Sequence, residues 1–192
     1  MDRGNGNGRY AMPLRPDDPS THERTEDALR RRARWGVGIF IAGLVLSGLT
    51  AFPLAKELEI IAMLIGPGGA LGALPPGGLQ QWIFIVRDGL AETYAHYPWF
   101  AYGTDWLAFG HIVIAMFFIP AWRDPAAQAS VLRTGLVACA LVIPLALVAG
   151  PLRGIPFYWR LIDCSFGVFG AIPLWYALSC IRKLNASRQS VS

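Results

Sequence analysis

The chain has 192 residues, of which 54% are hydrophobic and 16% are charged, and its mean hydropathy is +0.39. This length leaves room for one packed unit and excludes a second folded domain. The net charge of +4 comes from basic residues that flank apolar stretches, a pattern that argues against a nucleic-acid partner and favours membrane lipid.

Four uncharged apolar stretches are each close to the roughly 20 residues that a tilted helix needs to cross a bilayer. They cover residues 35–55, 106–122, 134–152 and 164–181. Lipid offers no hydrogen-bond partners to the backbone, so each stretch has to be helical. The predicted fold is therefore all-α, a polytopic membrane protein with four transmembrane helices in one unit, 34–182.

Residues 1–33 are predicted to form a cytoplasmic tail with a juxtamembrane helix. Ser20 and Glu23 have capping-box spacing, and Glu26 is four residues before Arg30, which favours a short helix that runs into the first span. Arginines then gather at the expected headgroup level, where they could contact anionic lipid or the acidic surface of a partner. These arginines are Arg30, Arg31, Arg32 and Arg34.

The distribution of Lys and Arg predicts the orientation. If both termini are cytoplasmic, 13 of the 17 basic residues lie inside, as the positive-inside rule requires. Residues 183–192 would then be a cytoplasmic C-terminal tail.

Small residues four apart form stripes on which a neighbouring helix can approach the backbone. Two such stripes lie in the first span and one in the fourth: Gly38 and Ala42; Gly43, Ser47 and Ala51; Gly167 and Ala171. Packing within the four-helix unit is one interpretation of these stripes. Packing against another subunit is the other.

The outer loop, residues 56–105, contains two Gly- and Pro-rich breaks that confine helices to the intervals between them. Apolar residues at helical spacing from Leu79 to Leu90, with polar residues between them, predict an amphipathic helix too short to cross the membrane. We expect it to lie flat at the interface. Aromatic residues between Tyr94 and Trp106 suit the same level, as a lipid anchor or as a protein-binding surface.

The second and third spans are joined by a short segment that contains Asp124 and Pro125. These residues predict a helix that is capped by Asp124 and starts at Pro125, so that the two spans form an antiparallel hairpin. Pro144 and Pro173 lie inside the third and fourth spans and are expected to kink them.

His111 is the only histidine inside a predicted span. A haem held by two membrane histidines is therefore not expected, whereas a (bacterio)chlorophyll needs only one axial imidazole. A neutral His111 that is hydrogen-bonded inside the bundle is the simpler interpretation. No cofactor is required by the sequence, but contact with bound lipid, (bacterio)chlorophyll or carotenoid is compatible with it.

Four charged residues gather at the outer ends of the spans: Asp105, Arg153, Arg160 and Asp163. Arg160 and Asp163 are three residues apart on one predicted helix, which favours a structural ion-pair cluster. Catalysis would need a nucleophile or a metal set beside them. The sequence contains no phosphate-binding loop, dinucleotide fingerprint or zinc-protease motif, and we interpret Cys139, Cys164 and Cys180 as packing residues.

Two segments carry a resemblance to a known group: GTDWLAFGHIVIA from Gly103 and RGIPFYWRLIDCSFG from Arg153. They resemble small four-helix inner-membrane proteins of diverse bacteria to which no activity is assigned. The resemblance covers the second to fourth spans. It implies four helices and a bacterial inner membrane, and it assigns no functional residue.

These observations lead to two hypotheses of function. The first is a non-catalytic accessory or structural subunit of a larger energy-transducing membrane complex, photosynthetic or respiratory, whose partners are lipids and other integral-membrane subunits. The second is a small stand-alone membrane enzyme or carrier that uses the outer polar cluster with His111 beneath it.

Overall fold

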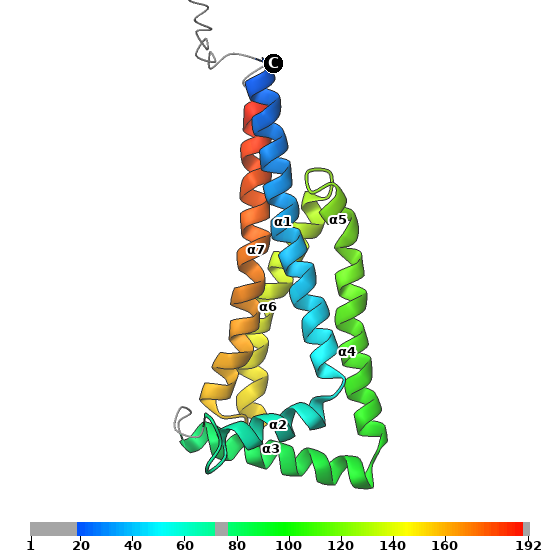
Figure 1. Ribbon diagram of the computed structural model, residues 1–192, viewed down its shortest axis with the longest axis vertical. Helices are drawn as coiled ribbons and strands as arrows, with labels where there is room; N and C mark the ends of the chain where they lie inside the picture. The colour runs from blue at the N-terminus through cyan, green and yellow to red at the C-terminus, as the bar shows by residue number, and fades with distance from the viewer. Residues whose placement is uncertain (1–18, 72–76, 190–192) are drawn as a thin grey trace, which may run out of the picture.

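The computed structural model describes residues 19–71 and 77–189, and all regular secondary structure in these ranges is α-helical (Figure 1). The helices are α1 (Pro19–Ala51), α2 (Leu54–Ile65), α3 (Gly77–His96), α4 (Trp99–Phe117), α5 (Ile119–Arg123), α6 (Ala129–Leu152) and α7 (Phe157–Gln189). Four stretches are long and apolar enough to cross a membrane: α1, α4 with α5, α6, and α7. The prediction of an all-α, multi-pass membrane protein is confirmed.

The four spans form a row rather than a closed bundle. α1 packs against α4 on one side and against α7 on the other, and α6 packs along α7 (Figure 1). The sequence predicts a hairpin of the second and third spans, but α4 and α6 do not pack along one another. The turn between them carries the chain from one end of the row to the other.

The start of α6 also differs from the prediction. Residues 124–128 form a turn in which the Ala127 N–H donates to Asp124 Oδ1 at 3.3 Å, and the helix begins only at Ala129. Asp124 therefore stabilises a local turn instead of capping the helix at Pro125, as such side chains commonly do next to a proline.

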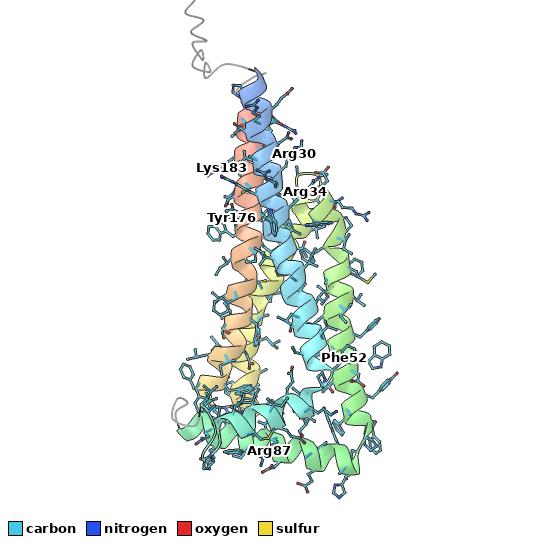
Figure 2. All side chains as sticks on the ribbon, viewed as in Figure 1. Arg30, Arg34, Phe52, Arg87, Tyr176 and Lys183 are labelled. Carbon is cyan, nitrogen blue, oxygen red and sulfur yellow. The ribbon has the colours of Figure 1, made fainter. Side chains whose placement is uncertain are left out.

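The main apolar core lies where α1, α5, α6 and α7 converge. Its fully buried members include Val37, Leu132 and Leu174, and the Phe40 and Phe118 rings lie 4.8 Å apart between centroids beside them. Arginines from several helices surround this end of the molecule, which we call the basic end: Arg34, Arg123, Arg133 and Arg182. Figure 2 shows Arg30 and Arg34 on α1 at the same end as Lys183 on α7.

At the opposite end α4 diverges from α7, and α2 and α3 lie across the space between them (Figure 1). A second, smaller core there joins Ala62 of α2 and Ile83 of α3 with Trp159 of α7. The Tyr158 hydroxyl donates to the Gly78 carbonyl oxygen at 2.6 Å, which ties α3 to the start of α7. We call this layer the α2–α3 plate.

The segment in which the sequence predicts an amphipathic helix is helical, as α3, whereas α2 is an element that the sequence interpretation did not name. The first span was expected to reach residue 55, but α1 ends at Ala51. Pro53 explains the difference, because proline has no N–H to donate and disfavours helical geometry in the residue before it.

α1 and α7 have 33 residues each. At 1.5 Å per residue each is about 50 Å long, some 20 Å more than the hydrocarbon core of a bilayer. The two helices extend side by side beyond the basic end, where Arg188 Nη2 and Glu26 Oε2 lie 3.0 Å apart (Figure 1). We call this extension the α1–α7 stalk.

In the stalk, α1 is one continuous helix from Pro19 into the first span. Glu26 pairs with Arg188 across the stalk rather than with Arg30 on its own helix. The C-terminal segment from Lys183 to Gln189 continues α7 as a helix. Residues 1–18 of the predicted N-terminal tail lie outside the described residues.

Candidate functional site

An apolar groove runs along the outer face of α1 next to α5, with a volume of about 930 Å³. Its floor is made by Gly38 and Ala42, and its sides by larger residues of α1 together with Ile119 and Trp122. Arg31 and Arg34 close it at the basic end. We call it the α1–α5 groove.

The first small-residue stripe, Gly38 and Ala42, lines this groove. Ala42 is exposed, and a Cβ at Gly38 would meet only the indole of Trp122, at 3.3 Å from Nε1. A Cβ at Gly43 would meet no atom within 4 Å. In the second stripe, Ser47 and Ala51 are half-buried. Ala42 is therefore open to another molecule, whereas Gly38 lies half-buried against the Trp122 side chain, and neither packs against a helix backbone of this chain.

The stripe in the fourth span, Gly167 and Ala171, packs within this chain. A Cβ at Gly167 would lie 2.5 Å from the Cys139 carbonyl oxygen, so α6 and α7 touch backbone to backbone there. Ala171, one turn later, packs against the main core. Close packing also occurs at Gly36, where a Cβ would lie 2.7 Å from the Pro173 carbonyl oxygen of α7.

The sequence pattern of small residues four apart does not include Gly36, because the residue four positions later is Phe40. The available signal was its place two residues, about half a turn, before Gly38 and so on the other side of the helix. A helix turns by about 100° per residue, so Gly36 and Gly38 point in directions about 200° apart. Each glycine therefore serves a different neighbour.

The predicted headgroup arginines differ in their surroundings. The Arg34 guanidinium donates twice to the Arg123 carbonyl oxygen, from Nε at 3.1 Å and from Nη2 at 2.7 Å. This bond satisfies a carbonyl at the end of α5 and ties α5 to α1. Arg31 and Arg32 are exposed, and Arg30 is half-buried.

His111 is half-buried on α4, facing α1 where a Cβ at Gly48 would lie 3.1 Å from the His111 Cβ. Its Nδ1 lies 2.9 Å from the Leu107 carbonyl oxygen. A carbonyl only accepts, so Nδ1 carries the proton and Nε2 of the neutral ring keeps its lone pair. The same arrangement fixes the ring of metal-binding histidines, and it makes Nε2 the atom that could accept a hydrogen bond or serve as an axial ligand.

The four residues of the predicted ion-pair cluster are not paired with one another. The ion pairs in the described ranges join Arg87 to Asp88 and Arg188 to Glu26. Arg160 instead lays its side chain against Gly150, with its guanidinium carbon 5.2 Å from the centre of the Phe157 ring. Its Nε is buried without a hydrogen-bond partner among the described residues.

The remaining members lie apart. Arg153 is exposed at the end of α6, and its backbone N–H bonds to the Ala149 and Gly150 carbonyl oxygens. Asp163 is half-buried on α7. Asp105 lines a separate pocket of about 440 Å³ between the start of α2 and α4, together with Lys56, Tyr94 and Thr104.

This last pocket, which we call the α2–α4 pocket, was not predicted. The Tyr94 hydroxyl and Thr104 Oγ1 lie 3.0 Å apart, and Thr104 donates to the Ala101 carbonyl oxygen at 2.7 Å. The pocket has one cation and one anion but no histidine or cysteine. Among residues 19–71 and 77–189 no group of three or more His, Cys, Asp or Glu side chains could hold a metal ion.

Comparisons with protein-family models, with curated proteins and with solved structures find no match to this chain.

Proposed function

We propose that this protein is a non-catalytic accessory subunit of a larger energy-transducing complex, photosynthetic or respiratory, in a bacterial inner membrane. The observation that carries the proposal is the uncovered α1–α5 groove. Small floor residues between large apolar sides let another helix approach the α1 backbone closely, which is how membrane helices associate when lipid and side chains are equally apolar.

The dimensions and charge of the groove suit a transmembrane helix of another subunit. Leu49 lies 15 residues after Arg34 on α1, so the groove between them is about 22 Å long at 1.5 Å per residue, which is most of the hydrocarbon thickness. Arg31 is exposed at the basic end and is available to an acidic side chain on the incoming helix. The open row of spans supports the same proposal, because α1 packs against α4, α5 and α7 and leaves the face that forms the groove uncovered.

Replacing Ala42 with leucine tests the proposal. The side chain would fill the groove floor and is expected to lower the yield of co-purifying subunits at least about tenfold, because overpacking of a tight contact costs roughly 1–3 kcal/mol. The measurement is mild-detergent purification of the tagged chain, with mass spectrometry of its partners. Ala140→Leu is the matched control, since Ala140 is also exposed on a span but lies outside the groove.

A wild-type chain that purifies alone would contradict the accessory role. Loss of partners in both variants would mean that leucine at any exposed span position disturbs assembly. The groove would then not be identified as the site of subunit contact. The visible absorption spectrum of the same samples adds a second result. Pigment bands that vanish in His111→Ala would assign His111 Nε2 as the axial ligand of a (bacterio)chlorophyll.

The orientation is part of the proposal. We infer that the basic end is cytoplasmic, because most Lys and Arg residues lie there and the positive-inside rule then holds. The α2–α3 plate would lie at the outer interface. On α3, Ile83 is buried, and Gln81 and Glu92 are exposed.

Single cysteines in a chain without native cysteines check this orientation. In intact cells an impermeant maleimide is expected to label Glu92→Cys on α3, while Lys183→Cys on α7 reacts only after the membrane is opened. Both positions are exposed, so access to the reagent and not burial decides the result. Labelling of Lys183→Cys in closed cells would reverse the topology.

A second function is a stand-alone enzyme or carrier, and the α2–α4 pocket is the observation in its favour. Lys56 and Asp105 bring opposite charges to one pocket beside the Tyr94 and Thr104 hydroxyls, which could hold a small zwitterion. A colourless, monomeric wild-type protein that binds such a molecule would support this function over the first.

A further inference from the structure

A notch of about 410 Å³ lies between α6 and α7 at the basic end, on a different face from the α1–α5 groove. Arg133 and Leu136 line it from α6, and Trp175, Leu178 and Arg182 line it from α7. The two helices run in opposite directions, so Arg133 and Arg182 share one level and the apolar residues lie deeper. We call it the α6–α7 notch.

Both arginines border the apolar spans directly. Arg133 immediately precedes the uncharged stretch 134–152, and Arg182 immediately follows the stretch 164–181. This places the two guanidinium groups at the level of lipid phosphates. At 1.5 Å per residue, Leu136 lies about 4.5 Å deeper than Arg133, and Trp175 about 10 Å deeper than Arg182.

The charge of the notch is not compensated. No acidic residue lines it, and neither arginine belongs to an ion pair among the described residues. Arg182 Nη2 donates to Ser179 Oγ at 3.2 Å, which leaves the other guanidinium N–H groups for a ligand. The first turn of α6 also carries no acidic residue, so the positive end of its dipole adds to the attraction for an anion.

We propose that the α6–α7 notch binds an anionic glycerophospholipid, with the phosphate between Arg133 and Arg182 and one acyl chain along Leu136, Leu178 and Trp175. Guanidinium groups match phosphate oxygens with paired hydrogen bonds, and basic pockets between transmembrane helices hold anionic headgroups in this way. The apolar walls below the arginines select a lipid over a free phosphate. The notch does not depend on the proposed accessory function.

The test is native mass spectrometry of the purified full chain, mixed with phosphatidylglycerol or with phosphatidylcholine. We expect phosphatidylglycerol to be retained preferentially. The double variant Arg133→Gln/Arg182→Gln should retain at least about tenfold less of it, the effect of losing charge-assisted hydrogen bonds. The control Arg24→Gln/Arg153→Gln removes the same charge from two exposed positions outside the notch and should retain the wild-type amount.

Three results would overturn the proposal: equal retention of the two lipids by the wild type, equal loss in the two double variants, and displacement of the lipid by millimolar glycerol phosphate. The last result would describe an anion site without an acyl-chain seat. Thermal unfolding without added lipid separates binding from folding, because Arg133 and Arg182 are exposed and their replacement should leave the melting temperature unchanged. If the double variant does not fold, Arg133→Gln alone is compared with Arg24→Gln.

Discussion

Replacing Gly36 with leucine is expected to separate α1 from α7 and to destabilise the whole row of spans. A Cβ at this position would lie 2.7 Å from the Pro173 carbonyl oxygen and 3.3 Å from the Ala177 Cβ. A backbone carbonyl cannot move aside as a side chain can, so the helices must part. We expect a loss of about 3 kcal/mol or more, near the upper end of overpacking effects.

Thermal unfolding of the purified chain measures this effect. For a chain of this size a loss of 3 kcal/mol corresponds to a fall of roughly 6–12 °C in the melting temperature. Gly43→Leu is the control on the same helix, because a Cβ there meets no atom within 4 Å, and its melting temperature should stay close to that of the wild type. Equal falls in the melting temperatures of both variants would show that α1 tolerates no large residue at either face, and the effect would not be specific to the contact with α7.

Replacing Leu174 with alanine is expected to leave a cavity in the main core and to cost about 2–5 kcal/mol. Leu174 is 0% exposed. Its Cδ1 and the Phe118 ring both press on Gly135, where a Cβ would lie 2.9 Å and 2.8 Å from them. The close backbone of α6 leaves no side chain that could fill the space, so the structure can relax only in part.

Leu145→Ala is the matched control for this cavity. Leu145 lies on a span but is 66% exposed, so lipid or detergent replaces the lost atoms and the cost should stay below about 1 kcal/mol. The two variants are compared by unfolding in the same detergent. A Leu174→Ala protein as stable as Leu145→Ala would mean that the buried core does not hold the spans together.

The sequence was sufficient for the four spans and for α3 because their signals are local. Uncharged stretches predict the spans, and apolar residues at helical spacing predict α3. The row arrangement was not predictable in the same way. In lipid an outward-facing leucine is as favourable as a buried one, so the apolar pattern does not tell which face of α4 or α6 meets a neighbour. The expected hairpin of these two spans is the direct result of that ambiguity.

The candidate sites also differ in whether a local sequence pattern could predict them. Gly38 and Ala42 could be found from their spacing, although the sequence left open whether they face this chain or another. Charged residues were harder, because the partner of a long side chain depends on helix rotation and on distant segments. Glu26 lies four residues before Arg30 but pairs with Arg188, 162 residues away. In the same way Asp105 lies with Lys56 in the α2–α4 pocket rather than with the outer arginines.

The α1–α7 stalk has a consequence for biosynthesis. Residues 52–156 separate the two helices, and at 5–20 residues per second a ribosome needs roughly 5–20 s to translate them. During this interval α1 is already made, but α7 does not yet pack against it. The face of α1 that α7 will meet carries Ala33 and Val37, which are 1% and 0% exposed in the finished protein. The arrival of α7 therefore covers this face of α1, and a product stalled before α7 keeps that face open to membrane proteases.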